Sequence, residues 1–215
     1  PLSALNASVE LILDEISAMS RAEIVELLNS IHYSVTALQT LIDNLLESTS
    51  IEAGHFRIRR RKVNLNNVIA EAVRVIDPLL RRRHQRLLVH EPQHMPVASL
   101  DPTRITQVLV NLLSNASKYS PMEEEIELRV EWTEGEPLYF SIEDSGPGIT
   151  DPEGQNLFQR FVRLGEKDGA QYGVGLGLFV VKSIVEEHGG QVGVSNRESG
   201  GSIFWFTIPM EGNLS

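Results

Sequence analysis

The first third of the chain carries two apolar stripes with the spacing of packed helices. In the first stripe, apolar residues recur alternately three and four positions apart: Leu2, Leu5, Val9, Ile12, Ile16 and Met19. The second stripe has the same spacing: Ile24, Leu28, Ile31, Val35, Leu38, Ile42 and Leu45. These two stripes, which together we call the seam of the hairpin, predict two amphipathic helices. Ser20 and Glu23 form a capping-box sequence that opens the second helix, and Gly54 is its expected stop signal.

The short turn between the two stripes predicts an antiparallel helical hairpin over residues 1–54. A single hairpin cannot cover both of its apolar stripes, whereas two copies pairing into a four-helix bundle can. We therefore expect a homodimer. The alternative is a monomeric hairpin that packs on the rest of the chain. Residues 55–64, which are rich in arginine, form the expected linker or an entering strand.

From residue 65 to residue 215 we predict a second domain in which helices and strands are mixed. The expected helices are 65–83, 102–117 and 176–188. The expected strands are 86–89, 125–132, 138–143, 192–195 and 202–208. Because the elements do not alternate as regular βαβ units, the pattern favours an α+β two-layer sandwich over a doubly wound sheet.

Composition narrows the functional classes. With 41% hydrophobic and 22% charged residues, the chain is typical of soluble globular proteins. Its 19 basic and 29 acidic residues give a net charge of −10, which disfavours nucleic acids and anionic membranes as partners. The sequence contains no cysteine and no apolar run long enough to span a bilayer, so we expect a cytoplasmic location and no membrane contact. Because the chain begins at Pro1, we also expect residues upstream of it.

Three motifs carry candidate chemistry. In the first, Asn111, Asn115 and Lys118 fall on one face of a predicted helix. An amide oxygen can ligate Mg²⁺, and an ammonium group can pair with phosphate. Taken alone, the same residues could be ordinary capping or surface side chains.

The second motif is Asp144-Ser-Gly146-Pro-Gly148-Ile149, directly after a predicted strand. A carboxylate there can accept a hydrogen bond from an amino group such as that of adenine, and the glycines allow close approach of a ligand. An ordinary Gly-Pro turn is the alternative.

The third motif, Gly173-Val-Gly175-Leu-Gly177, leads into a predicted helix, whose N-terminal N–H groups can bind an anion. It is neither a Walker sequence nor a dinucleotide-binding fingerprint.

Together with the segment 157–163, these motifs closely resemble the N, first glycine, F and second glycine boxes of two-component sensor histidine kinases. The resemblance covers nearly the whole chain, since 51–54, 101–107 and 200–204 also match. Pro1-Leu2 is similar to the tail of the family's acceptor motif, whose histidine would lie five residues before Pro1, outside this chain.

The resemblance implies a GHKL-type ATP-binding fold with a lid over about 165–172. It implies ATP and Mg²⁺ as cofactors, with Asn115 as the Mg²⁺ ligand. The implied nucleotide contacts are Asn111, Asn115, Lys118, Tyr119, Asp144, Gly146, Gly148, Ile149, Gly173, Gly175, Leu176 and Gly177. The implied catalytic residues are Asn111, Lys118, Arg160 and Arg163.

The implied function is that of an ATP-dependent protein-histidine kinase, a homodimeric transferase of two-component signal transduction. It would phosphorylate a histidine of the dimerisation helix, for phosphorelay to an aspartate of a response-regulator receiver domain. Asn111 stands where hydrolytic members of the superfamily carry a glutamate base, which favours transfer over hydrolysis. Without the acceptor, we expect this chain to bind Mg-ATP but not to phosphorylate itself at the usual position.

Two other functional classes stay open. The chain could be a degenerate nucleotide-binding scaffold whose hairpin binds partner proteins, or a serine kinase of the anti-sigma type, which the long hairpin disfavours. Among the six histidines, His32 is interpreted as a solvated helix residue and His188 as a helix C-terminal residue favoured by the dipole. No pair of histidines has metal-ligand spacing.

Overall fold

The computed structural model describes residues 2–15, 18–149, 156–162 and 175–210. Its first part is the predicted hairpin, formed by α1 (Leu2–Glu15) and α2 (Arg21–Glu52). Both halves of the capping box are present at the start of α2: the Glu23 backbone N–H donates to Ser20 Oγ at 3.3 Å, and the Ser20 N–H donates to Glu23 Oε2 at 2.7 Å. Beyond the end of α2, Gly54 has the positive φ of 67° that favours glycine after a helix.

The second part is an α+β sandwich, as predicted. Its helices are α3 (Leu65–Arg82), α4 (Pro102–Tyr119) and α6 (Gly177–Glu187). The strands of its main sheet are β2 (Arg86–His90), β4 (Glu125–Glu131), β5 (Leu138–Glu143), β6 (Val192–Asn196) and β7 (Ser202–Ile208). They lie in the order β2-β4-β5-β7-β6, in which β2 and β4 are parallel and the other neighbours antiparallel.

A separate two-stranded sheet pairs β1 (Arg61–Asn64) with β3 (Val97–Leu100) in antiparallel register. The entering strand was one of the two possibilities for the arginine-rich stretch, whereas β3 was not predicted. Only four residues long and carrying the small residues Ala98 and Ser99, β3 lacks a recognisable alternation of large apolar side chains.

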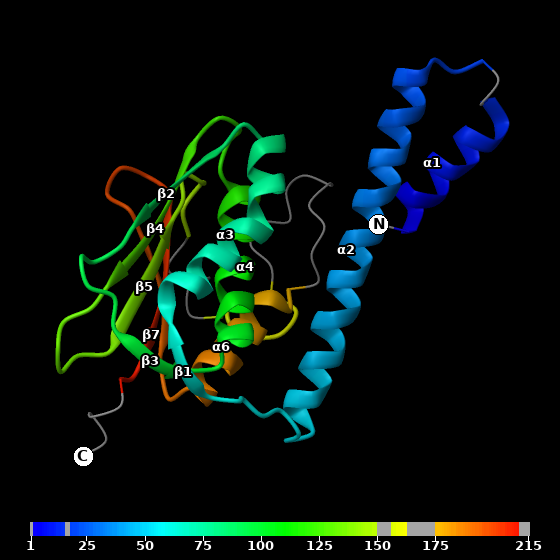
Figure 1. Cartoon of the computed structure of the whole chain (residues 1–215). Helices are drawn as coiled ribbons and strands as arrows, with labels where there is room; N and C mark the ends of the chain where they lie inside the picture. The colour runs from blue at the N-terminus through cyan, green and yellow to red at the C-terminus, as the bar shows by residue number, and fades with distance from the viewer. Residues whose placement is uncertain (1, 16–17, 150–155, 163–174, 211–215) are drawn as a thin grey trace.

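The helices cover one face of the main sheet (Figure 1), and the core lies between these two layers. Alternate side chains of β7 point into it, so that Phe204, Phe206 and Ile208 are buried. The ring of Phe206 stacks on that of Phe140 with 4.5 Å between centroids. In this core α4 packs against β5, and the second motif begins where β5 ends.

The C-terminal half of α2 runs beside the α/β domain, while its N-terminal half and α1 stand clear of it (Figure 1). The contact has an apolar part, in which Ile51 packs against the core, and a polar part, in which Glu47 forms an ion pair with Arg104 and accepts a hydrogen bond from Gln107. The Arg104 guanidinium also lies 4.9 Å from the centre of the Phe56 ring. In the described residues, no helix has both the length and the apolar character needed to cross a membrane.

Candidate functional site

The first motif lies on α4, where it has the geometry predicted from its spacing. Asp101 caps the start of the helix, and its Oδ1 accepts hydrogen bonds from two backbone N–H groups of the first turn. One face of α4 is buried in the core and comprises Ile105, Val108, Leu109, Leu112, Leu113 and Ala116. Asn111, Asn115 and Lys118 are only partly buried. Core packing therefore presents two amides and an ammonium group together on the other side of the helix.

A buried glutamine fixes the C-terminal end of this helix. Gln85 Nε2 donates to the backbone carbonyls of Ser117, at 3.0 Å, and Pro121, at 2.8 Å. The Ser117 hydroxyl in turn donates to Gln85 Oε1 at 2.6 Å. These bonds hold the turn that carries Lys118 and Tyr119. Sequence reasoning missed Gln85, because a single polar residue outside any motif gives no periodic signal.

The second motif starts at a buried carboxyl group. Asp144 is 2% exposed, and its Oδ1 accepts backbone hydrogen bonds from Gly146 at 2.8 Å and Ser202 at 3.3 Å. Burial raises the pKa of this carboxyl above its ordinary value, and the two hydrogen bonds and the nearby Arg197 only partly oppose that shift. A buried acceptor of this kind suits a ligand that donates a hydrogen bond.

Glycine is required where this loop approaches α4. A Cβ on Gly146 would lie 2.8 Å from Asp144 Oδ1 and 3.1 Å from the Tyr119 carbonyl oxygen. The neighbouring Ser145 N–H donates to Ser120 Oγ at 3.2 Å. The structure thus brings the second motif against the end of the first. At the far end of the loop, Gly148 has a φ of +76° and Ile149 is buried in the core.

The third motif reaches the same region from the start of α6. Gly177 is the first residue of that helix, and a Cβ there would lie 3.5 Å from Asn111 Oδ1. Gly175 has a φ of +74°, and its carbonyl accepts a hydrogen bond from the Phe161 N–H at 3.0 Å. The Leu176 side chain is 2% exposed, so this residue can contact a ligand only through its backbone. Gly173 lies outside the described residues, as does the expected lid.

Segments more than 60 positions apart in the sequence thus meet around one face of α4. A family model for the histidine kinase-, DNA gyrase B-, and HSP90-like ATPase matches residues 100–212. The chain belongs to this family.

Individual relatives are similar to this chain over its hairpin as well as over its α/β domain. The chain is 36% identical to the sensor protein KdpD of Clostridium acetobutylicum over 212 residues. The matched region covers 98% of this chain and 23% of that protein. It spans about a quarter or less of the curated relatives matched first.

Two solved structures have the same fold along the whole chain. One is the Acinetobacter baumannii histidine kinase AdeS, with a TM-score of 0.72, 24% identity and coverage of 99% of this chain and 96% of that one. The other is the histidine kinase ThkA in complex with the response regulator protein TrrA, with a TM-score of 0.71, 22% identity and coverage of 100% and 59%. The comparisons confirm the predicted resemblance to a two-component sensor kinase transmitter core.

Arg160 of this histidine kinase core faces the hairpin. Its guanidinium group forms an ion pair with Glu52 and donates a hydrogen bond to the Ser48 carbonyl, both on α2. The same group lies over the Phe179 ring, 4.5 Å from its centre. Arg163, the other arginine predicted to be catalytic, lies outside the described residues. In the structure, the contacts of Arg160 are therefore with α2 and α6, and its role in catalysis stays a prediction.

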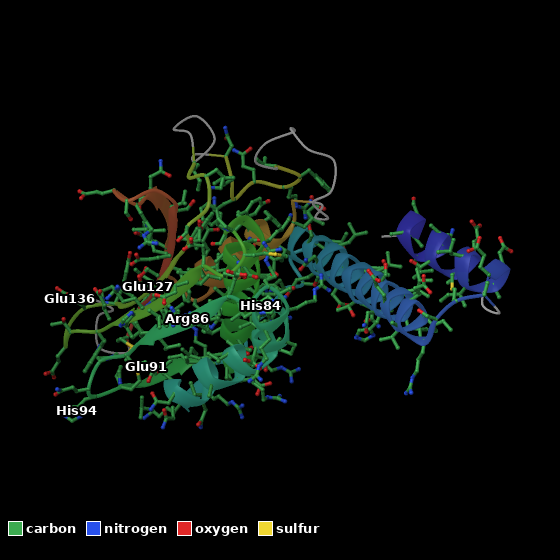
Figure 2. All side chains as sticks on the ribbon, turned by 90° about the horizontal axis from the view of Figure 1, so that it is seen from above. His84, Arg86, Glu91, His94, Glu127 and Glu136 are labelled. Atoms are coloured by element: carbon green, nitrogen blue, oxygen red, sulfur yellow. The ribbon has the colours of Figure 1, made fainter. Side chains whose placement is uncertain are left out.

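Side chains that could form a separate metal centre are not gathered in the described part of the chain, where no group of three His, Cys, Asp or Glu residues could hold an ion. His84 and His94 lie well apart on the α/β domain (Figure 2). For Mg²⁺, the fitting donors are those of the first motif, because an amide oxygen and a nearby anionic ligand such as phosphate suit this ion.

Proposed function

We propose that this histidine kinase core binds Mg-ATP between α4, the loop 144–149 and the start of α6, and transfers the γ-phosphoryl group to a histidine on the dimerisation helix. The observation that carries the proposal is the meeting of three motifs at α4: Gly177 lies against Asn111, and Gly146 lies against Tyr119. Family membership supports ATP as the ligand. From the histidine, the phosphoryl group passes to an aspartate of a response-regulator receiver domain.

The adenine base is assigned to the buried end of the site. Both backbone donors at Asp144 bond to Oδ1, so Oδ2 is assigned the hydrogen bond from the adenine amino group. Tyr119 lies against the base, and Gly146, Gly148 and Ile149 line its pocket. Burial of the carboxyl favours adenine over a base that has no donor at that position, because such a base would leave a buried acceptor unpaired.

The phosphates are assigned to the other end, over the half-buried amides of α4. Asn115 ligates Mg²⁺, and Asn111 supports it at the phosphates. Lys118 contacts phosphate as a point charge. Backbone N–H groups around Gly173, Gly175 and Gly177 hold the polyphosphate at the helix N-terminus.

The reaction is phosphoryl transfer to protein. At position 111 the side chain is an amide, which cannot take a proton from water at neutral pH, so this position supplies no base for hydrolysis. Arg163 and Arg160 are assigned to neutralise charge on the transferred group. For Arg160, this role requires release from its ion pair with Glu52.

The partners follow from the hairpin. Several seam residues stay exposed in the single chain, among them Leu28 at 53%, Ile42 at 49% and Leu45 at 50%. A second copy covers such a stripe as a four-helix bundle, which gives the homodimer. A receiver domain docks on the same hairpin. We place this activity in the cytoplasm, as the cytoplasmic part of its parent protein.

The first experiment is a calorimetric titration of a non-hydrolysable ATP analogue into the chain, with and without Mg²⁺. We expect Mg²⁺ to strengthen binding in the wild type and in the control Ser114→Ala, and to have no effect in Asn115→Ala. Ser114 is the neighbour of Asn115 on α4 but is not among the predicted site residues. A folded wild type that binds no analogue would favour the alternative, a degenerate scaffold whose hairpin binds partner proteins.

Phosphotransfer is tested separately, by supplying labelled ATP to this chain and to a longer chain that includes the upstream histidine. The proposal expects label on the longer chain and none on this one. Label on His32 of this chain would overturn the interpretation of that residue as a solvated helix position. If the longer chain binds the ATP analogue but also takes up no label, the kinase proposal fails and the nucleotide-binding scaffold is favoured.

A further inference from the structure

The loop 144–149 is secured at both ends by the hairpin of β6 and β7. At its start, the Asp144 N–H donates to the Ser202 carbonyl at 2.9 Å, continuing the pairing of β5 with β7. A Cβ on Gly201 would lie only 1.9 Å from the Asp144 carbonyl oxygen, so the two backbones are in close contact. The start of the loop is thus held against β7 by backbone contacts, in addition to the hydrogen bond from the Ser145 N–H to Ser120 Oγ.

The far end of the loop is held by one side chain. Asn196, the last residue of β6, accepts a hydrogen bond from the Ile149 N–H through Oδ1 at 2.7 Å. Its Nδ2 donates to the carbonyl of the same residue, also at 2.7 Å. The amide thus engages both polar backbone groups of Ile149, as a neighbouring strand does in an antiparallel pair. Two bonds to one residue fix the orientation of its backbone as well as its position.

The residue before Ile149 is shaped to this contact. Gly148 has a φ of +76°, and a Cβ there would lie 3.1 Å from Asn196 Oδ1 and 3.6 Å from the Gly201 carbonyl oxygen. A larger residue would be strained at this φ and would press on the amide. Gly148 and Asn196 therefore form one unit, in which the glycine lets the loop close on the side chain.

We propose that Asn196 is a positioning residue for the nucleotide base: it sets the Gly148–Ile149 side of the pocket opposite Asp144. This inference rests on the proposed binding of ATP at this site. Asparagine is suited to the task because one side chain supplies both an acceptor and a donor. Aspartate has the same shape, but its carboxylate would face the Ile149 carbonyl, where a donor is needed.

Because of its position, Asn196 can be substituted to test a positioning role without a large effect on stability. Asn196 lies at an exposed position at the end of an edge strand, so water can replace its bonds when the side chain is removed. Loss of the amide is therefore expected to release the loop without unfolding the domain. Its neighbour Ser195 is also exposed, and its side chain points to the opposite face of the sheet. Ser195→Ala is thus the matched control.

The test compares the wild type with Asn196→Ala, the isosteric Asn196→Asp and Ser195→Ala. Calorimetry measures the affinity for non-hydrolysable ATP and GTP analogues with and without Mg²⁺, and hydrogen exchange measures protection of the Ile149 amide without nucleotide. Both Asn196 variants should bind the ATP analogue about tenfold more weakly. Alanine loses both hydrogen bonds to Ile149, whereas aspartate loses the donor and turns a carboxylate oxygen towards the Ile149 carbonyl. Both should discriminate less against the GTP analogue, and Asn196→Ala, which also loses the acceptor, should exchange the Ile149 amide faster. The factor by which Mg²⁺ strengthens binding should stay as in the wild type, because the phosphate end is untouched.

Other results would overturn the inference. Wild-type affinity in both Asn196 variants would show that the base does not depend on this contact. A loss of affinity that includes the Mg²⁺ effect and a large fall in melting temperature would show a purely structural role. If the wild type itself binds neither analogue, the proposed function fails and this inference falls with it. That outcome is recognised in the wild type alone.

Discussion

The backbone N–H of Asp101 donates a hydrogen bond to Nε2 of His188 across 3.0 Å, joining the start of α4 to the end of α6. His188 is 1% exposed, and its Nδ1 lies 2.7 Å from the Ile184 carbonyl oxygen. Since Nε2 accepts, Nδ1 carries the proton, and the ring is neutral. The predicted place at a helix C-terminus is confirmed, since His188 is the C-cap of α6. The side chain serves there as a buried polar bridge.

Stability should therefore fall in mild acid. Burial lowers the pKa of His188 below its ordinary value of 6.5. Above about pH 6.5 the ring is neutral in both states, whereas below it the unfolded chain takes up a proton that the folded chain resists. The free energy of unfolding therefore decreases as the pH falls below about 6.5, and it levels off below the pKa of His188 in the folded protein.

Chemical denaturation at several pH values between 7.5 and 5.5 tests this expectation. His188→Gln should be less stable than the wild type at pH 7.5, and the difference should shrink as the pH falls. His55→Gln, at an exposed position, controls for the loss of one ring. A difference between wild type and His188→Gln that stays constant over this range would contradict a neutral buried ring.

Asp144→Asn should separate stability from binding. Burial raises the pKa of Asp144 above its ordinary value of 3.8, so the carboxyl favours folding most when protonated, and that contribution is lost as the pH rises through the folded pKa. The variant should therefore be more stable than the wild type at pH 7, and the gain should disappear below about pH 3.8. Denaturation curves at pH 7 and pH 3.5 measure this gain.

The same variant should lose nucleotide binding. The N–H groups of Gly146 and Ser202 both donate to Oδ1, so the new amide must place its oxygen there. Its NH₂ group then faces the adenine amino group, and two donors meet. We expect the affinity for an ATP analogue to fall about 10- to 100-fold, the range for a hydrogen bond to a charged group. Unchanged affinity in calorimetry would remove Asp144 from the base pocket.

Two glycines should respond oppositely to alanine. Gly177 begins α6, and a Cβ there would be in ordinary contact, 3.5 Å from Asn111 Oδ1. Gly177→Ala should keep or raise the free energy of unfolding, by up to about 1 kcal/mol. Gly201 has a φ of +97°, and its Cβ would lie 1.9 Å from the Asp144 carbonyl oxygen. Gly201→Ala should lose more than about 2 kcal/mol in the same denaturation measurement. Similar losses in both variants would contradict the described backbone contacts.

The sequence allowed the local parts of this structure to be predicted. Apolar periodicity identified the two hairpin helices and α4, and the spacing of Asn111 and Asn115 placed them on one face of that helix, because helical geometry depends only on sequence separation. The pairing of the three motifs came from resemblance to a family, since no local rule brings Gly177 beside Asn111.

Long-range polar contacts were beyond prediction. Gln85, Asn196 and Arg160 each bond to residues 32 or more positions away. Such a contact leaves no periodic trace and depends on the finished packing. Arg160 illustrates the limit: the resemblance implied a role at the phosphates, but no pattern in the sequence predicted its contacts with Glu52 and Ser48 of the hairpin.

The exposed seam of the hairpin gives the last prediction, which concerns assembly. Leu28 is 53% exposed and lies on the predicted seam of α2, whereas Asn29 is exposed one position off it. In a four-helix bundle, Leu28→Asp would bury a charge at the interface, which costs a few kcal/mol and should weaken dimerisation at least about a hundredfold. Asn29→Asp adds the same charge away from the seam and should leave the dimer intact.

Analytical ultracentrifugation over a range of concentrations distinguishes the two arrangements of the hairpin. The proposed homodimer expects a dimeric wild type and a dimeric Asn29→Asp variant, with Leu28→Asp shifted to monomer at the same concentration. The folded state of Leu28→Asp is checked by its binding of the ATP analogue, because the nucleotide site is built from α4, α6 and the sheet and does not include this part of α2. A wild type that stays monomeric at tens of micromolar would favour the alternative, in which the hairpin packs only on its own chain.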